Sequence, residues 1–439
     1  MHDSSFNKGT SAPEYTTLDE WIKKEAISFA VDPPERFNAA IDKAVASLDG
    51  SVELLGFGEA LHGGEDILLF RNRLFQRLVE AHGYCAIAIE SSLPRGRVVD
   101  EYITGRGPES FDAVQDTGFS HGFGRLGANR ELAEWMRLTN ADPSRHVKLR
   151  FYGFDSPTEI GASDSPRQLL HFVLDYLASI DEAKARLLHE RIDPLLGRDA
   201  DWEDPAAIMD PAKSVGLSPA ATELRVETEG LISELSIRRP ELAAQSGADR
   251  YLETVHYASQ ARQLLNYHAG LARSATDRVA RLLGLRDAMM ADNLAYIMSR
   301  EGGRGKVLAF AHNSHLKRGK AQWQLGPDLH AWWPAGAQLQ EIFGPRYAVI
   351  GSAVGVSDAQ GVGPPEAGTL ESRLRALPGP GRLIPTHRGR GLPASAIAAL
   401  PTRSGSPKNP TYFPLTPQSL TDFDWLVLLD STPEIPAAV

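Results

Sequence analysis

Six ionisable side chains lie at or just past the ends of four short apolar runs in this sequence: Glu59, His62, Glu90, Asp155, His312 and His315. A histidine can accept a proton from water and return it to a leaving group, because it titrates near neutral pH. A carboxylate beside it fixes its tautomer and stabilises the imidazolium. A second histidine or an arginine can stabilise the charge that develops on an attacked carbonyl oxygen. This combination of residue types favours hydrolysis without a covalent nucleophile.

Other catalytic chemistries find less support in the sequence. It contains no Gly-x-Ser-x-Gly motif, which disfavours the usual serine-hydrolase arrangement. The single cysteine, Cys85, starts an apolar run and is typical of a small core residue. The segment 302–305 is rich in glycine but lacks the Lys-Ser/Thr ending of a phosphate-binding loop. An acid–base site is therefore the better interpretation.

The pair His312 and His315 also raises the alternative of a zinc site. A catalytic zinc needs three protein ligands and an open position, and Glu59 and His62 could complete such a set. The pair follows an expected strand, however, rather than lying on a His-Glu-x-x-His helix. We therefore expect a site that works without a metal ion and without a cofactor.

The apolar periodicity predicts an α/β fold with a parallel-rich central sheet flanked by helices. Strands are expected at 52–57, 85–89, 147–154, 306–311, 347–353 and 425–429. Between the first two, apolar residues recur at helical spacing over 65–82, which completes a strand–helix–strand unit. Ligands of open α/β sheets bind in the crevice outside the carboxyl ends of the strands. The six ionisable residues should therefore gather at that edge of the sheet.

A long stretch without any strand pattern divides the sequence. We expect a flexible leader at 1–16 and a first part of the α/β catalytic domain at 17–165. An all-helical insertion over the active-site edge should follow at 166–302, and a second part of the catalytic domain at 303–439. Within the insertion, Arg286 and Asn293 share one helical face with Met290. Together with Asp155, they are expected to line the cleft and bind substrate. An interhelical hydrogen-bond network is the alternative for this face.

Composition and charge exclude several classes of protein. The 439 residues carry a formal net charge of −10, which argues against a general binder of nucleic-acid backbones. No stretch approaches ~18 consecutive apolar residues, so no membrane-spanning helix is expected. The polar N-terminus lacks the apolar core of a signal peptide. We expect a cytoplasmic monomer that acts on a small molecule.

The motifs around these residues resemble those of the erythromycin esterase family. The segment 58–63, Gly-Glu-Ala-Leu-His-Gly, is similar to the Gly-Glu-x-x-His-Gly signature of that family. The segments 286–293 and 311–315 are similar to two further signatures. The resemblance runs from about Leu18 to the C-terminus. One departure is Leu61, where the family usually has Thr or Ser, so a hydroxyl is missing from the site.

The resemblance implies that His62 is the general base and that a group of residues supports it: Glu59, Arg71, Glu90, His312 and His315. For Glu59 the alternative is a carboxylate that caps the following helix, and for Arg71 a solvated position paired with Glu65. The implied reaction is hydrolysis of an ester or lactone in a mid-sized, macrolide-like natural product, with water as the second substrate. Two alternatives remain: elimination, cyclisation or isomerisation in natural-product biosynthesis, and ligand binding without catalysis.

Overall fold

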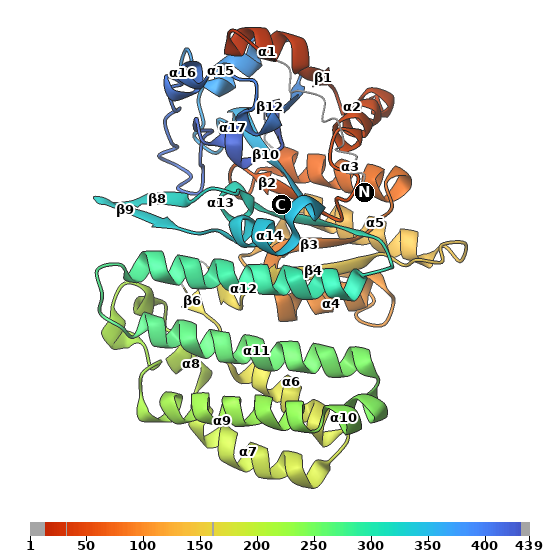
Figure 1. Cartoon of the computed structure of the whole chain (residues 1–439). Helices are drawn as coiled ribbons and strands as arrows, with labels where there is room; N and C mark the ends of the chain where they lie inside the picture. The colour runs from red at the N-terminus through yellow and green to blue at the C-terminus, as the bar shows by residue number, and fades with distance from the viewer. Residues whose placement is uncertain (1–13, 32, 160–161, 432–439) are drawn as a thin grey trace, which may run out of the picture. The chain divides into compact units, whose positions relative to one another are not determined.

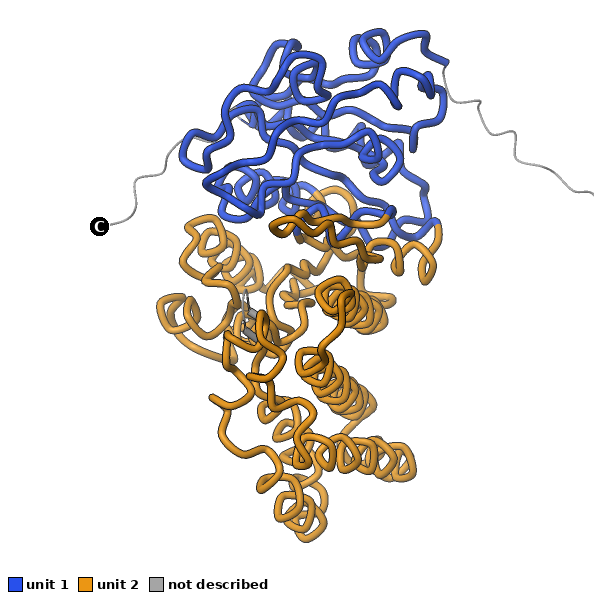
Figure 2. Tube along the Cα trace, turned by 90° about the vertical axis from the view of Figure 1, so that its left-hand side faces the viewer, with its two compact units in different colours: residues 1–77, 312–319, 345–439 blue, residues 78–311, 320–344 orange. Residues whose placement is uncertain are grey.

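The computed structural model describes residues 14–31, 33–159 and 162–431. It shows a mixed α/β protein, as the sequence predicts. The chain divides into two compact units (Figure 2): unit 1 comprises 1–77, 312–319 and 345–439, and unit 2 comprises 78–311 and 320–344. Within the described ranges, no helix is both long enough and apolar enough to span a membrane.

The expected leader at 1–16 falls mostly outside the described residues, which begin at residue 14. One residue of its described end is held by the rest of unit 1. Tyr15 is buried, and its backbone N–H donates to Gly391 O at 2.9 Å. Helix α1 (Leu18–Glu25) then begins after its N-cap, Thr17, as the sequence predicts.

In the described part of unit 1, five strands pair in the order β1-β11-β12-β10-β2. In that order they cover Ile27–Phe29, Gly381–Pro385, Trp425–Ser431, Tyr347–Val356 and Leu54–Glu59. Strand β10 is parallel to both of its neighbours, whereas β11 is antiparallel to β1 and to β12. Strands β2 and β10 are buried on both faces, which explains why their sequences are nearly continuous apolar runs. The short strands β1 and β11 are not predicted by the sequence.

Helix α3 (Glu65–Ala81), most of which belongs to unit 1, confirms the helix predicted at 65–82. Its Phe70 ring lies 5.2–5.7 Å from the rings of Phe29, Phe37 and Phe57, so that α3 shares an aromatic core with β1, α2 and β2. The other α-helices described in unit 1 are α2 (Pro34–Ala46), α13 (Asn313–Leu316), α15 (Leu370–Arg375), α16 (Ala394–Ala398) and α17 (Ser419–Asp422).

Unit 2 contains three parallel strands in the order β7-β3-β4. They cover Lys306–His312, Tyr84–Ser92 and Arg150–Asp155, and the last residue of β7 belongs to unit 1. Each of the six predicted strands is therefore present in one of the two units. Two antiparallel strand pairs in the described part of unit 2 are not predicted: β5 (Thr158–Glu159) with β6 (Ala162–Ser163), and β8 (Ala321–Leu325) with β9 (Asp328–Trp332). Helices α4 (Leu93–Ile103), α5 (Gly127–Ala141) and α14 (Ala335–Phe343) also belong to unit 2.

The segment between β6 and β7 is helical, as the sequence predicts. In the fully described span 167–301 the α-helices are α6 (Arg167–Ala178), α7 (Glu182–Leu196), α8 (Asp199–Trp202), α9 (Pro219–Ile237), α10 (Arg239–Ser246), α11 (Ala248–Leu271) and α12 (Arg278–Glu301). Figure 1 shows α12, α11, α9 and α7 as successive layers. A leucine-rich core joins these layers. Because α12 packs on β4, the helical segment reaches the strand ends of unit 2.

Candidate active site

The strongest candidate pair, Glu59 and His62, lies where strand β2 ends. Glu59 is the last residue of the strand, and its side chain is only 3% exposed. Its Oε1 lies 2.5 Å from Nδ1 of His62, whose side chain is 18% exposed. Because a carboxylate accepts hydrogen bonds, the contact places a proton on Nδ1 of His62, and the neutral form of the ring then has its lone pair on Nε2. This is the arrangement that a histidine general base needs.

Two glycines allow the chain to place this pair. Gly63 has a φ of 78°, a left-handed conformation that glycine adopts without strain. At Gly58 a Cβ atom would lie 2.3 Å from Oδ1 of Asn313, so only glycine lets the end of β2 approach that residue so closely. The side chain of Asn313 in turn bonds the backbone of Ser352 on β10, accepting from its N–H and donating to its carbonyl. The position of His62 is thus fixed by close packing as well as by Glu59.

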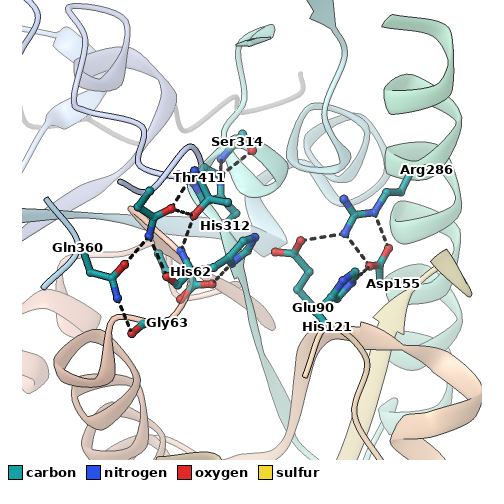
Figure 3. Close-up of polar contacts among 12 residues, drawn as sticks. His62, Gly63, Glu90, His121, Asp155, Arg286, His312, Ser314, Gln360 and Thr411 are labelled. Atoms are coloured by element: carbon teal, nitrogen blue, oxygen red, sulfur yellow. Dashed lines mark hydrogen bonds and ion pairs between the residues drawn. The ribbon is translucent and has the colours of Figure 1, made fainter. Parts of the chain in front are cut away.

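Thr411, which the sequence does not single out, contacts the same loop (Figure 3). The backbone N–H of His62 donates to Oγ1 of Thr411 at 3.0 Å. That hydroxyl donates to Oδ1 of Asn409 at 2.6 Å, and the amide of Asn409 donates to His62 O at 3.2 Å. The irregular segment that carries Asn409 and Thr411 therefore fixes the backbone of His62. No periodicity marks Thr411 in the sequence, since it lies in an irregular segment.

His312 ends strand β7, and its ring lies 5.3 Å from the ring of His62, centroid to centroid. Its Nε2 lies 2.9 Å from Thr411 O, and a carbonyl oxygen can only accept, so Nε2 carries a proton. Its Nδ1 accepts from the backbone N–H of Ser314 at 3.1 Å and lies 2.7 Å from the Ser314 hydroxyl. Both ring nitrogens are thus engaged by the protein. For Nε2–H of His312 to stabilise charge on an attacked carbonyl oxygen, its bond to Thr411 O would first have to break.

The two other expected residues of unit 1 are buried. His315 lies on α13 with 5% exposure, and its ring centroid is 6.4 Å from that of His312. Arg71 lies on α3 with no exposed surface, and its Nη2 donates to Oδ1 of Asn72 at 2.7 Å. The alternative of a solvated Arg71 is therefore wrong, because helix α3 turns this residue into the core.

A second polar cluster lies within unit 2, where helix α12 meets the ends of β3 and β4 (Figure 3). Arg286 on α12 donates to both carboxylate oxygens of Asp155, from Nε at 2.9 Å and from Nη2 at 2.6 Å. The same Nη2 donates to Oε1 of Glu90 at 2.9 Å. Asp155 has no exposed surface and the Glu90 side chain is 3% exposed. The structure therefore brings Glu90, Asp155 and Arg286 together, with the guanidinium of Arg286 facing the two buried carboxylates. We call this group the arginine cluster.

His121 belongs to the arginine cluster, although the sequence analysis gives it no role. Its Nε2 lies 3.1 Å from Oδ2 of Asp155, and its backbone has a φ of 57°, which is uncommon for a residue other than glycine. Burial alone would raise the pKa of Asp155, but the charge of Arg286 and the hydrogen bonds from His121 and Arg286 outweigh burial and lower that pKa. Asp155 is thus an ionised carboxylate at neutral pH. Its histidine partner comes from a loop that carries no recognisable pattern.

Asn293, expected to contact substrate, is fully buried with its amide bonded inside unit 2. Its Nδ2 donates to Phe154 O at 3.0 Å, and its Oδ1 accepts from Nε2 of His256 at 2.7 Å. Burial lowers the pKa of His256 to about 4, so this histidine is neutral at pH 7. These contacts favour the alternative for this helical face, an interhelical hydrogen-bond network that supports the end of β4.

The family model described as Erythromycin esterase matches residues 79–432 of the chain. The chain belongs to the erythromycin esterase family. The curated erythromycin esterase type II of Escherichia coli is 22% identical over 346 residues, which cover 76% of this chain and 76% of that protein. The family range includes Glu90, the arginine cluster and His312, whereas Glu59 and His62 precede it.

Solved structures also share the fold of this erythromycin esterase family member. A crystal structure of a Bacillus cereus protein has a TM-score of 0.71 at 17% identity, covering 94% of this chain and 96% of that one. A succinoglycan biosynthesis protein has a TM-score of 0.68 at 20% identity, covering 94% and 96%. A mutant of the erythromycin esterase EreC in its open conformation has a TM-score of 0.66 at 18% identity, covering 94% and 99%. At these identities the likeness concerns the fold alone.

Proposed function

We propose that this protein hydrolyses an ester or lactone bond in a macrolide-like natural product, with His62 as the general base that activates water. The observation that carries the proposal is the 2.5 Å contact between Nδ1 of His62 and the buried carboxylate of Glu59. The contact directs the lone pair of Nε2 away from Glu59 and stabilises the imidazolium that forms when Nε2 takes a proton. Membership of the erythromycin esterase family supports the class of bond and of substrate.

The reaction then needs a single acid–base residue. Nε2 of His62 removes a proton from water as the water oxygen attacks the carbonyl carbon. The tetrahedral intermediate collapses with cleavage of the bond to the alcohol oxygen, and the imidazolium returns its proton to that oxygen. Glu59 keeps the required tautomer throughout. His312 acts as a positioning residue, because its Nε2–H holds Thr411, which in turn bonds the backbone of His62.

We assign positioning roles to the other expected residues. Arg71 and His315 are buried in unit 1 and support the elements that carry the two histidines. Within unit 2, Arg286 bonds both Asp155 and Glu90 and so ties α12 to two strand ends. The positive charge of Arg286 is compensated by these two buried carboxylates, which suits a role in holding the structure together.

We also propose that hydrolysis needs no metal ion. The zinc alternative would use ring nitrogens of His62 and His312, and three of these four nitrogens are bonded to Glu59, Ser314 and Thr411: Nδ1 of His62 and both nitrogens of His312. Binding a metal there would first break those hydrogen bonds. Full activity after treatment with a chelator is the expected result; loss of activity that one divalent ion restores at one equivalent would overturn this part of the proposal.

Turnover of erythromycin in isotopically labelled water tests the reaction itself. Hydrolysis puts one labelled oxygen atom into the carboxylate of the opened product. A product of altered structure without label would identify elimination, cyclisation or isomerisation. Saturable binding of erythromycin and related lactones without any turnover would instead identify a binding protein. His62→Gln serves as the matched control, because it keeps a polar side chain while removing the base.

Thr411 offers a test of the positioning roles. Thr411→Val keeps the shape of the side chain but removes the acceptor of the His62 N–H. We expect kcat to fall roughly 10-fold, since a small displacement of the base is costly, and the free energy of unfolding to fall by about 1–3 kcal/mol. Thr411→Ser keeps the hydroxyl and should retain most of the wild-type kcat and of the free energy of unfolding. Equal kinetics of the valine and serine variants would show that this hydrogen bond does not position His62.

A further inference from the structure

A group of metal-ligand side chains lies within the helical segment of unit 2, on α6 and α7. Nε2 of His171 lies 2.8 Å from Oδ1 of Asp193, and Nδ1 of His189 lies 3.2 Å from Oδ2 of the same carboxylate. The three ligand atoms all lie within 4.8 Å of one another. Two imidazoles from different helices therefore converge on one carboxylate.

The local structure explains this convergence. His189 and Asp193 are four residues apart on α7 and so occupy one face of the helix. Helix α6 packs against α7, and this places His171 opposite that face. The three side chains are 33%, 30% and 43% exposed for His171, His189 and Asp193, respectively. An ion can thus reach the group from solvent, and a water molecule can fill a remaining position.

The three ligand atoms lie close enough together to surround one metal ion after side-chain rotation. In a tetrahedral zinc site with bonds of about 2.0–2.1 Å, neighbouring ligand atoms lie roughly 3.3 Å apart. Here the two nitrogens lie 2.8 and 3.2 Å from different oxygens of Asp193, and the ligand atoms lie within 4.8 Å of one another, so side-chain rotation would bring them around one ion. Two imidazole nitrogens with one carboxylate are typical ligands of zinc and of other divalent first-row metals, whereas calcium and magnesium prefer oxygen ligands throughout.

The charge of the surroundings also favours a cation. Burial acts to raise the pKa of Asp193, but its hydrogen bonds with both histidines outweigh burial and lower the pKa, so the carboxylate is ionised at neutral pH. His171 also lines an open pocket of about 580 Å³. Four further carboxylates line that pocket, together with two arginines: Asp164, Asp175, Asp199, Glu203, Arg95 and Arg167. One of these arginines, Arg167, is paired with Asp199 at 2.8 Å.

We propose that His171, His189 and Asp193 form a binding site for a zinc-type divalent ion that links α6 to α7. Three protein ligands and one water complete a four-coordinate site. The ion binds the folded helix pair and therefore stabilises it by mass action. The site lies apart in sequence from the residues that carry the proposed hydrolysis, and it does not depend on that proposal.

The test uses the full-length protein after removal of metal by a chelator and dialysis. Titration with zinc chloride in a calorimeter should show about one equivalent bound at this site, and cobalt(II) should give the visible absorption of a tetrahedral complex. We expect His171→Ala and His189→Ala each to weaken binding at least 10-fold and to abolish the zinc-dependent rise in Tm. His146→Ala is the matched control, because it removes an exposed histidine from a loop of the same unit.

Each outcome of this experiment decides the proposal. No binding to the wild-type protein, or binding that both variants retain, would overturn it and leave the group as a set of hydrogen-bonded ion pairs. Binding that His62→Ala abolishes while His171→Ala does not would place the ion at the other histidines and also overturn it. Circular dichroism shows whether a variant is folded, and the conservative His189→Gln provides a second test if His189→Ala is not.

Discussion

His62→Gln lowers kcat by at least about 10²-fold in the folded protein, the usual scale for loss of a general base. The glutamine side chain is polar but cannot accept a proton from water at neutral pH. The expectation follows from the contact of Nδ1 with Glu59 at 2.5 Å, which assigns Nε2 as the base. Steady-state hydrolysis of a macrolide lactone by the two proteins is the measurement, and His146→Gln is the control. Turnover close to wild type in a folded His62→Gln protein would refute the mechanism.

A double-mutant cycle with Glu59 extends this test. Glu59→Gln removes the negative charge but keeps the size of the side chain, so kcat should fall while the KM changes little. Because Glu59 acts through His62, the double variant should be no slower than His62→Gln alone. Additive losses would show that Glu59 has a separate role, such as capping the helix that follows it.

Arg286→Met lowers the free energy of unfolding by about 3–5 kcal/mol, the largest effect on stability that we expect. The substitution leaves the buried carboxylates of Asp155 and Glu90 without the cation that bonds both of them. Arg281→Met, on the exposed side of the same helix, should change stability by no more than about 0.5 kcal/mol. Urea unfolding of the three proteins measures the difference. Equal stability of the two variants would mean that the arginine cluster does not hold α12 to the strands.

The difference in free energy of unfolding between the wild-type protein and Arg286→Met should depend on pH, and the direction of that dependence can be predicted. The pKa of Asp155 is lowered in the wild-type protein, where Arg286 and His121 outweigh the opposing effect of burial. Its contribution to stability is therefore fully present above the ordinary aspartate value of about 3.9 and is lost as the pH falls through the lowered value. In Arg286→Met, only His121 is left to oppose the effect of burial, so the pKa of Asp155 should be higher than in the wild-type protein. Protonation then removes the cost of the buried charge at a higher pH in the variant. The gap in stability should thus be widest at neutral pH and narrow in acid; a constant gap would contradict this assignment.

The sequence by itself determined the α/β class, the six main strands and the helical segment at 167–301. These features follow from local periodicity, since buried parallel strands are continuous apolar runs and amphipathic helices repeat their apolar residues. The contact between Glu59 and His62 could also be predicted from the sequence. The two residues are three positions apart, at a strand end followed by a glycine turn, so local geometry alone brings them together.

The tertiary structure alone decided which groups hold these residues in place. Thr411 bonds His62 across 349 positions, and His121 bonds Asp155 across 34, both from irregular segments in which no repeat marks a functional residue. Asn293 shows the opposite case. Its helical spacing predicts the face of the helix on which it lies, but not the groups that this face contacts. In the structure its side-chain amide bonds Phe154 O and His256. Hydrogen-bond partners are chosen by packing between distant segments. A sequence pattern indicates only which side of a helix or strand is buried, so it cannot identify the hydrogen-bond partners of a residue.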